Sequence, residues 1–138
     1  NAGNVITPYT TDRPCAASAT IEYAVDVLGV RDIVVCGHSH CGAVGAAVRG
    51  DDLTSAPAVR EWLHGNGIGR GVARAADADD PALTTAVTRH LAEQLETLRT
   101  YPGVDRRMAD GRLRVHGWFY EVHTGEVRQL RDGSLAAL

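Results

Sequence analysis

A short apolar run that leads into two histidines and a cysteine is the feature that most constrains this chain. Residues Ile33-Val34-Val35-Cys36 are followed at once by Gly37-His38-Ser39-His40-Cys41-Gly42. A β-branched apolar run of this length predicts a buried strand of the kind found in parallel sheets. Small apolar residues typical of a packed helix follow, so His38 falls at the carboxyl end of the strand. Open α/β sheets bind their ligands at that position.

The rest of the chain predicts further helices and strands around this strand. Helical spacing of apolar residues, with helix start and stop signals, indicates helices over 14–28, 41–49, 56–64, 81–100 and 104–109. Strands are expected over 31–36, 113–122 and 126–131, with Thr124-Gly125 as the turn between the last two. The stretch 65–80 is expected to be a loop, and 132–138 a loose tail. This order predicts one α/β domain over residues 1–138, with a mainly parallel sheet flanked by helices and a C-terminal antiparallel hairpin strand.

His38 and Cys41 lie three residues apart across the predicted strand-to-helix turn. An imidazole and a thiol at this spacing converge on a soft divalent metal, above all zinc. The first turn of a helix favours negative charge, and the thiolate is the form of cysteine that binds metal. Gly42 leaves the helix start open, so its backbone N–H is a candidate donor to a small substrate. A catalytic zinc site takes three protein ligands and a water, so the pair leaves a third ligand to be found.

The other histidines and cysteines are weaker candidates. His40 is the rival ligand, but it is adjacent to Cys41 and is expected to point away. Cys36 is expected to be a small buried hydrophobe within the apolar run, and Cys15 a core or surface thiol near a helix start. The remaining histidines are expected to be surface or structural residues: His64, His90, His116 and His123.

Composition excludes several classes of function. The formal net charge is −3, and all 14 basic residues are arginine, so no basic excess suggests binding to nucleic acid or to an anionic membrane. No apolar stretch reaches the length of a membrane span. A phosphate-binding loop at Gly37–Gly45 is disfavoured, because the spacing is not that of a P-loop and the chain has no lysine.

Two features of the chain bear on its setting. Three cysteines are too few for a disulfide scaffold and indicate a reducing compartment, so we expect a cytoplasmic location. The first residue is Asn1 rather than Met. We therefore expect the segment to come from a longer protein, so that the domain is incomplete at its N-terminus.

Several segments together resemble the β-class carbonic anhydrases. They run in order and at family spacing from residue 1 to about 131: Asn1-Ala2-Gly3-Asn4, Pro8-Tyr9, Ile21-Glu22-Tyr23-Ala24-Val25 and Val35-Cys36-Gly37-His38-Ser39-His40-Cys41-Gly42-Ala43. The stretches 58–63 and 116–120, with Thr124-Gly125, are similar to the plant-like branch that includes the bacterial cyanate-operon enzyme.

The resemblance implies a site and an activity. By it, His38 and Cys41 are zinc ligands, the N–H of Gly42 meets bicarbonate, and Ala2 and Tyr23 line the substrate pocket. The family's third ligand is a cysteine in a Cys-x-Asp-x-Arg motif, which is absent from residues 1–138 and is expected upstream of Asn1. The implied reaction is reversible hydration of CO2 to bicarbonate and a proton, in a homodimer or larger homo-oligomer.

Two other readings follow from the same residues. With two ligands only, the chain would be an inactive carbonic-anhydrase-like fragment or a regulatory or binding domain. Relatives with the same fold and ligands also act on carbonyl sulfide or carbon disulfide, so a related hydrolase is a weaker alternative.

Overall fold

The computed structural model describes residues 4–138. Ala2, a predicted pocket residue, lies outside this range. The helices are α1 (Ala16–Glu22), the π-helix η1 (Tyr23–Val27), α2 (Gly42–Arg49), α3 (Pro57–Gly65), α4 (Pro81–Arg99) and α5 (Pro102–Ala109). The strands are β1 (Asp32–His38), β2 (Arg114–Tyr120), β3 (Val127–Arg131) and β4 (Ser134–Ala137). No helix in this part of the chain is both long enough and apolar enough to cross a membrane.

The four strands form one mixed sheet in the order β1-β2-β3-β4. β1 pairs with β2 in parallel, from Asp32 opposite Arg114 to His38 opposite Tyr120. β2 with β3 and β3 with β4 are antiparallel. The α/β class and the C-terminal antiparallel hairpin are therefore confirmed, and one of the three strand pairings is parallel.

The predicted loose tail at 132–138 is wrong. Asp132 and Gly133 both have positive φ, at 48° and 79°. These are the angles that a two-residue type I′ hairpin turn needs, and Asp-Gly is one of its preferred sequences. Arg131 pairs with Ser134 across the turn, so the last residues return as β4.

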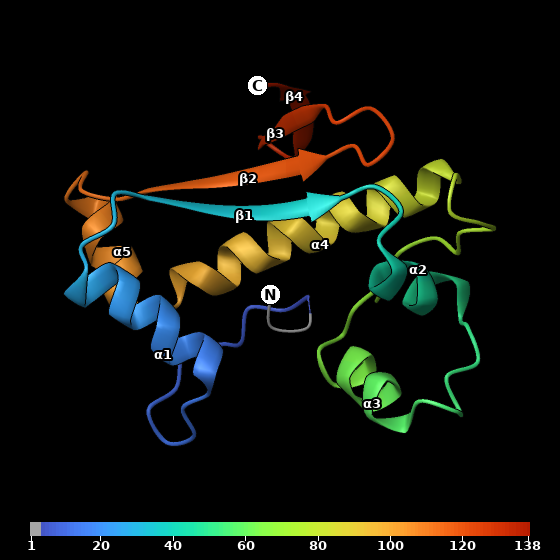
Figure 1. Cartoon of the computed structure of the whole chain (residues 1–138), viewed down its shortest axis with the longest axis horizontal. Helices are drawn as coiled ribbons and strands as arrows, with labels where there is room; N and C mark the ends of the chain where they lie inside the picture. Colours follow the sequence, from blue (N-terminus) through green and yellow to red (C-terminus); the bar gives the residue numbers. More distant parts are fainter. Residues whose placement is uncertain (1–3) are drawn as a thin grey trace.

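Helix α4 lies along one face of β1 and β2 (Figure 1). It begins as predicted at Asp80, whose carboxylate accepts a hydrogen bond from the N–H of Ala82 at 2.8 Å. Two strand glycines leave room for this helix. A Cβ on Gly37 would lie 3.3 Å from Cγ1 of Val87, and one on Gly117 would lie 2.7 Å from Cδ1 of Leu95.

Two apolar clusters hold the helices against the sheet. One gathers α2, α3 and the start of α4 around Phe119, which is fully buried. The other lies at the opposite end of α4, around Leu98 and Tyr101. The predicted stripe of α4 is buried at Leu83, Val87, Leu91 and Leu98 and half-buried at Leu95.

The predicted helix over 14–28 and the strand after it differ in detail. The helix changes from α to π geometry at Tyr23 and ends before Gly29, which has a φ of 66°. The strand runs two residues further than predicted, through Gly37 and His38. His38 is therefore the last residue of β1 rather than part of the turn.

Candidate metal centre

The imidazole of His38 is oriented by the backbone of the next residue. Its Nδ1 lies 2.9 Å from the carbonyl oxygen of Ser39. A carbonyl oxygen can only accept, so Nδ1 carries the proton and Nε2 keeps its lone pair. This backbone bond fixes the tautomer that a histidine needs in order to bind a metal through Nε2.

Cys41 occupies the N-cap position of α2. Its side chain makes no capping hydrogen bond and is 4% exposed. The thiol donates to Oδ1 of Asn4 at 3.7 Å. The sulfur therefore lies beside the first turn of the helix, in a buried position next to Asn4.

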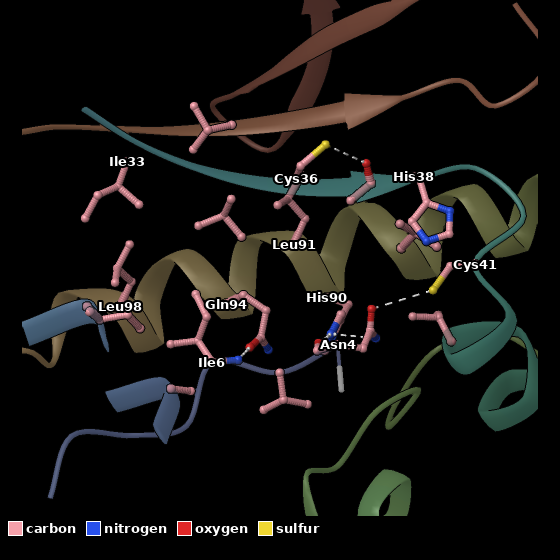
Figure 2. Close-up of a pocket in the computed structure, with 18 of the residues that line it drawn as sticks. Asn4, Ile6, Ile33, Cys36, His38, Cys41, His90, Leu91, Gln94 and Leu98 are labelled. Carbon is pink, nitrogen blue, oxygen red and sulfur yellow. Dashed lines mark hydrogen bonds between the residues drawn. The ribbon is translucent and has the colours of Figure 1, made fainter. Parts of the chain in front are cut away.

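His38 and Cys41 face one pocket of about 560 Å³ between β1, α4 and the segment from Asn4 to Ile6. Figure 2 shows the imidazole and the thiol turned toward the same end of it. The walls are mostly apolar side chains, including Ile33, Val44 and Leu91. The structure therefore places the two predicted ligands where a small substrate could reach a metal held between them.

The sequence of the chain matches a known protein family. The profile of the family described as carbonic anhydrase matches residues 1–127. The chain belongs to the carbonic anhydrase family, in its β class. The site just described therefore belongs to a β-carbonic anhydrase fold.

Individual relatives agree with this family. The chain is 46% identical over 136 residues to a carbonic anhydrase of Pseudomonas aeruginosa, covering 97% of this chain and 61% of the relative. Among solved structures, the β-carbonic anhydrase CcaA matches with a TM-score of 0.84 and 34% identity, over 100% of this chain and 64% of that one. One of two tetrameric β-carbonic anhydrases of Sordaria macrospora matches with a TM-score of 0.71 and 25% identity, over 98% and 66%. The chain thus spans about three fifths of the length of the Pseudomonas aeruginosa relative and of CcaA.

The two side chains at the centre, the imidazole of His38 and the thiol of Cys41, are of the types that bind zinc. Imidazole nitrogen and thiolate sulfur are the ligands that zinc takes in proteins. Within residues 4–138, no set of three histidine, cysteine or carboxylate ligand atoms lying within 4.8 Å of one another includes His38 or Cys41. The described residues therefore offer two candidate ligands, His38 and Cys41, where a catalytic zinc takes three from protein.

Gly42 is the first residue of α2, directly after Cys41. The N–H groups of a first helical turn have no partner within their own helix. A Cβ built on Gly42 meets no atom within 4 Å, so the space beside its backbone is open. Gly42 is not among the residues that line the pocket, so the role of its N–H as a donor to substrate remains a prediction.

Tyr23 does not line the pocket described here. The residues of this region that face the pocket are Ala16, Ala17, Thr20 and Ile21. Tyr23 is two residues beyond Ile21, about 200° further around the helix axis. Its side chain is 55% exposed, and its predicted place in the substrate pocket remains a prediction.

The expectation that Cys36 is buried is wrong. β1 is an edge strand of the described sheet, and its burial alternates along the strand. Cys36 falls on the exposed set of residues, although it also borders the pocket, where desolvation raises the pKa of its thiol. An apolar run of this kind is buried on both faces only when its strand lies in the middle of a sheet.

Two residues of α4 that line the pocket were not predicted to belong to the site. His90 is 8% exposed, and its Nε2–H donates to the carbonyl of Asn4 at 2.8 Å. Gln94, one helical turn later, accepts from the N–H of Ile6 at 2.7 Å (Figure 2). Both side chains fix the segment that carries Asn4 against α4. The i, i+4 spacing of His90 and Gln94 on the apolar face of α4 was the available signal.

Proposed function

We propose that the full-length protein is a zinc-dependent carbonic anhydrase, which interconverts CO2 with bicarbonate and a proton. The observation that carries the proposal is that His38, whose Nδ1 is bonded to the Ser39 carbonyl so that Nε2 is left for a metal, lines the same apolar pocket as Cys41. Membership of the carbonic anhydrase family supports the same reaction.

Each residue has a defined task in this proposal. His38 and Cys41 would hold zinc, and the backbone N–H of Gly42 would orient bicarbonate. The chemistry that zinc supplies when bound is Lewis acidity, which lowers the pKa of a coordinated water from about 15.7 to near 7. The apolar pocket walls would accept CO2 and keep bulk water from competing with it.

We further propose that the third zinc ligand is a cysteine outside residues 1–138. In the family it belongs to a Cys-x-Asp-x-Arg motif, whose aspartate and arginine organise the metal-bound water. The sequence of the full-length protein tests this directly. A Cys-x-Asp-x-Arg motif upstream of Asn1 is expected, and its absence would contradict a three-ligand centre of this type.

Stopped-flow CO2 hydration by the full-length protein tests the function. His38→Ala and Cys41→Ala should each lower kcat/KM by more than about a hundredfold. Mutation of a residue that only hydrogen-bonds to a metal ligand already lowers metal affinity or activity by about 10–100-fold. His64→Ala and Cys15→Ser are matched controls outside the pocket lining and should keep the activity. Activity that survives both ligand substitutions would contradict the proposal.

Assays with carbonyl sulfide and carbon disulfide on one preparation test the related-hydrolase alternative.

The alternative is an inactive carbonic-anhydrase-like or regulatory domain. The observation in its favour is that the described residues supply two ligands at this centre. Zinc content of the full-length protein separates the two functions. One tightly held zinc per chain, lost in Cys41→Ala, supports the enzyme, whereas a metal-free protein supports the inactive domain.

We propose that the protein is a homodimer or larger homo-oligomer and that it works in the cytoplasm. The relatives from Sordaria macrospora are tetrameric. On this chain, β1 is an edge strand of the described sheet and carries the exposed Val34, and Val27 and Leu28 are exposed at the end of η1. The net charge of −3 gives no support to a nucleic-acid partner or an anionic membrane surface.

Light scattering of the full-length protein measures the assembly. A monomer at micromolar concentration would contradict the proposed homo-oligomer.

A further inference from the structure

A second cluster of metal-binding side chains lies outside the pocket. His40, Asp79 and His123 come from three segments far apart in sequence, yet one ligand atom from each lies within 4.8 Å of the other two. Nε2 of His40 is 2.9 Å from Oδ1 of Asp79. The rings of His40 and His123 meet edge to face, with centroids 4.4 Å apart. None of the three side chains lines the pocket that holds His38 and Cys41.

The backbone holds these three segments in place. The turns after β1 and β2 and the loop before α4 meet at the same end of the sheet (Figure 1). Ser39 N–H donates to the carbonyl of Tyr120, and Ser39 Oγ accepts from the N–H of Val122, each at 2.9 Å. These two bonds fix the turn that carries His40 beside the turn that carries His123.

Asp79 is held from the other side. Its N–H donates to Oδ1 of Asp77 at 2.9 Å, and Asp80 next to it caps α4. The carboxylate of Asp80 also accepts from the N–H of Ala76 at 2.7 Å. The loop is thereby shaped so that the carboxylate of Asp79 meets the imidazole of His40.

His40 adopts a backbone conformation that favours glycine. Its φ is 58°, in the left-handed region, which is uncommon for a residue with a Cβ. The two neighbouring residues, Ser39 and Cys41, are buried, whereas His40 itself is turned outward to Asp79. Such outliers concentrate at functional positions, where the surrounding structure holds them in place.

The distances suit a transition metal. Two ligands with bonds of about 2.1 Å at right angles are about 3.0 Å apart, close to the separation of the His40 nitrogen and the Asp79 oxygen. Two imidazoles and one carboxylate form a ligand set for zinc, nickel, cobalt or iron. The exposed side chains of Asp79 and His123 are free to close around an ion and leave further positions to water.

We propose that His40, Asp79 and His123 form a second divalent transition-metal site, which ties the loop before α4 to the ends of β1 and β2. It takes none of its ligands from the His38 and Cys41 centre. A bound ion would replace the hydrogen bond between His40 and Asp79 with two coordinate bonds and would add His123 to the same centre.

Calorimetric titration of the full-length protein with NiCl2 tests the site by its stoichiometry. The wild type should bind one Ni²⁺ per chain more than either His123→Ala or Asp79→Asn. His116→Ala is the matched control, because Nε2 of His116 also lies 2.9 Å from an exposed carboxylate, that of Asp32. His116 and Asp32 have no third ligand atom beside them among the described residues, and Asp32 is also paired with Arg114. The His116→Ala variant should therefore bind as much Ni²⁺ as the wild type. Equal stoichiometry in the wild type and both site variants would overturn the proposal, whatever metal the His38 and Cys41 pair holds.

Limited trypsin digestion provides a second readout that does not depend on stoichiometry. Arg74 lies exposed in the loop before α4. Ni²⁺ should slow cleavage after Arg74 in the wild type and in His116→Ala, and should leave the rate unchanged in His123→Ala. A cleavage rate in the wild type that does not respond to Ni²⁺ would contradict the tie between loop and strands.

Discussion

The hydroxyl oxygen of Ser39 accepts a hydrogen bond from the backbone N–H of Val122 at 2.9 Å. Ser39 is 5% exposed and lies between His38 and His40, so this bond ties the turn after β1 to the end of β2. Both candidate metal centres depend on the position of that turn.

Ser39→Ala should lower the free energy of unfolding by about 1 kcal/mol, because it removes a hydrogen bond and leaves the Val122 N–H without this partner. Urea denaturation measures the change. Thr54→Val is a surface control that also removes a hydroxyl hydrogen bond, that to Asp52, and should cost less. An equal or smaller loss for Ser39→Ala than for this control would contradict the role of the bond.

Gly117→Ala should destabilise the packing of α4 on the sheet. The added Cβ would lie 2.7 Å from Cδ1 of Leu95 and 3.3 Å from Cβ of Leu130. Overpacking of this kind costs about 1–3 kcal/mol. Combining Gly117→Ala with Leu95→Ala should cost less than the sum of the two single changes, since the clash is relieved. Strict additivity in a double-mutant cycle would argue against the contact.

Asp80 should make stability depend on acid pH. Hydrogen bonds from the N–H groups of Ala76 and Ala82 lower the pKa of its carboxyl below the ordinary 3.8. The stabilisation is therefore complete above pH 3.8 and is lost as pH falls through the lower native pKa. Melting curves of the wild type and Asp80→Asn should differ most near neutral pH and converge in acid. A difference that stays constant down to pH 2 would contradict this explanation.

Cys15 should react with iodoacetamide faster than the other two cysteines near neutral pH. Its thiol is exposed, and hydrogen bonds from Thr7 and Ser18 lower its pKa to about 7. Cys36 has a raised pKa and Cys41 is buried. Peptide mapping after brief labelling measures the order, and Thr7→Val should move the midpoint of the Cys15 rate to higher pH. Faster labelling of Cys36 would contradict it.

Much of the fold could be predicted because local signals decide it. Asp80-Pro81 specifies the start of α4, and the apolar run at 33–36 specifies a strand. The exposure of Cys36 could not be predicted, because it depends on which strands flank β1. Asp132-Gly133 is a sequence typical of a type I′ hairpin turn and could have predicted the hairpin. The residues after it are small and show no clear alternation, so they did not indicate a strand.

The candidate site was predictable in part for similar reasons. His38 and Cys41 are close in sequence, so their convergence follows from a strand-to-helix turn. The hydrogen bonds of His90 and Gln94 to the segment around Asn4 join residues 86 and 88 positions apart, and no local pattern reports them. The cluster of His40, Asp79 and His123 likewise depends on three loops meeting, which only the folded chain shows.

Anomalous diffraction at the zinc edge from crystals of the full-length protein tests the central claim most directly. The account predicts a zinc peak bonded to Nε2 of His38 at about 2.1 Å and to Sγ of Cys41 at about 2.3 Å. A zinc-loaded crystal with no peak between these two side chains would contradict it.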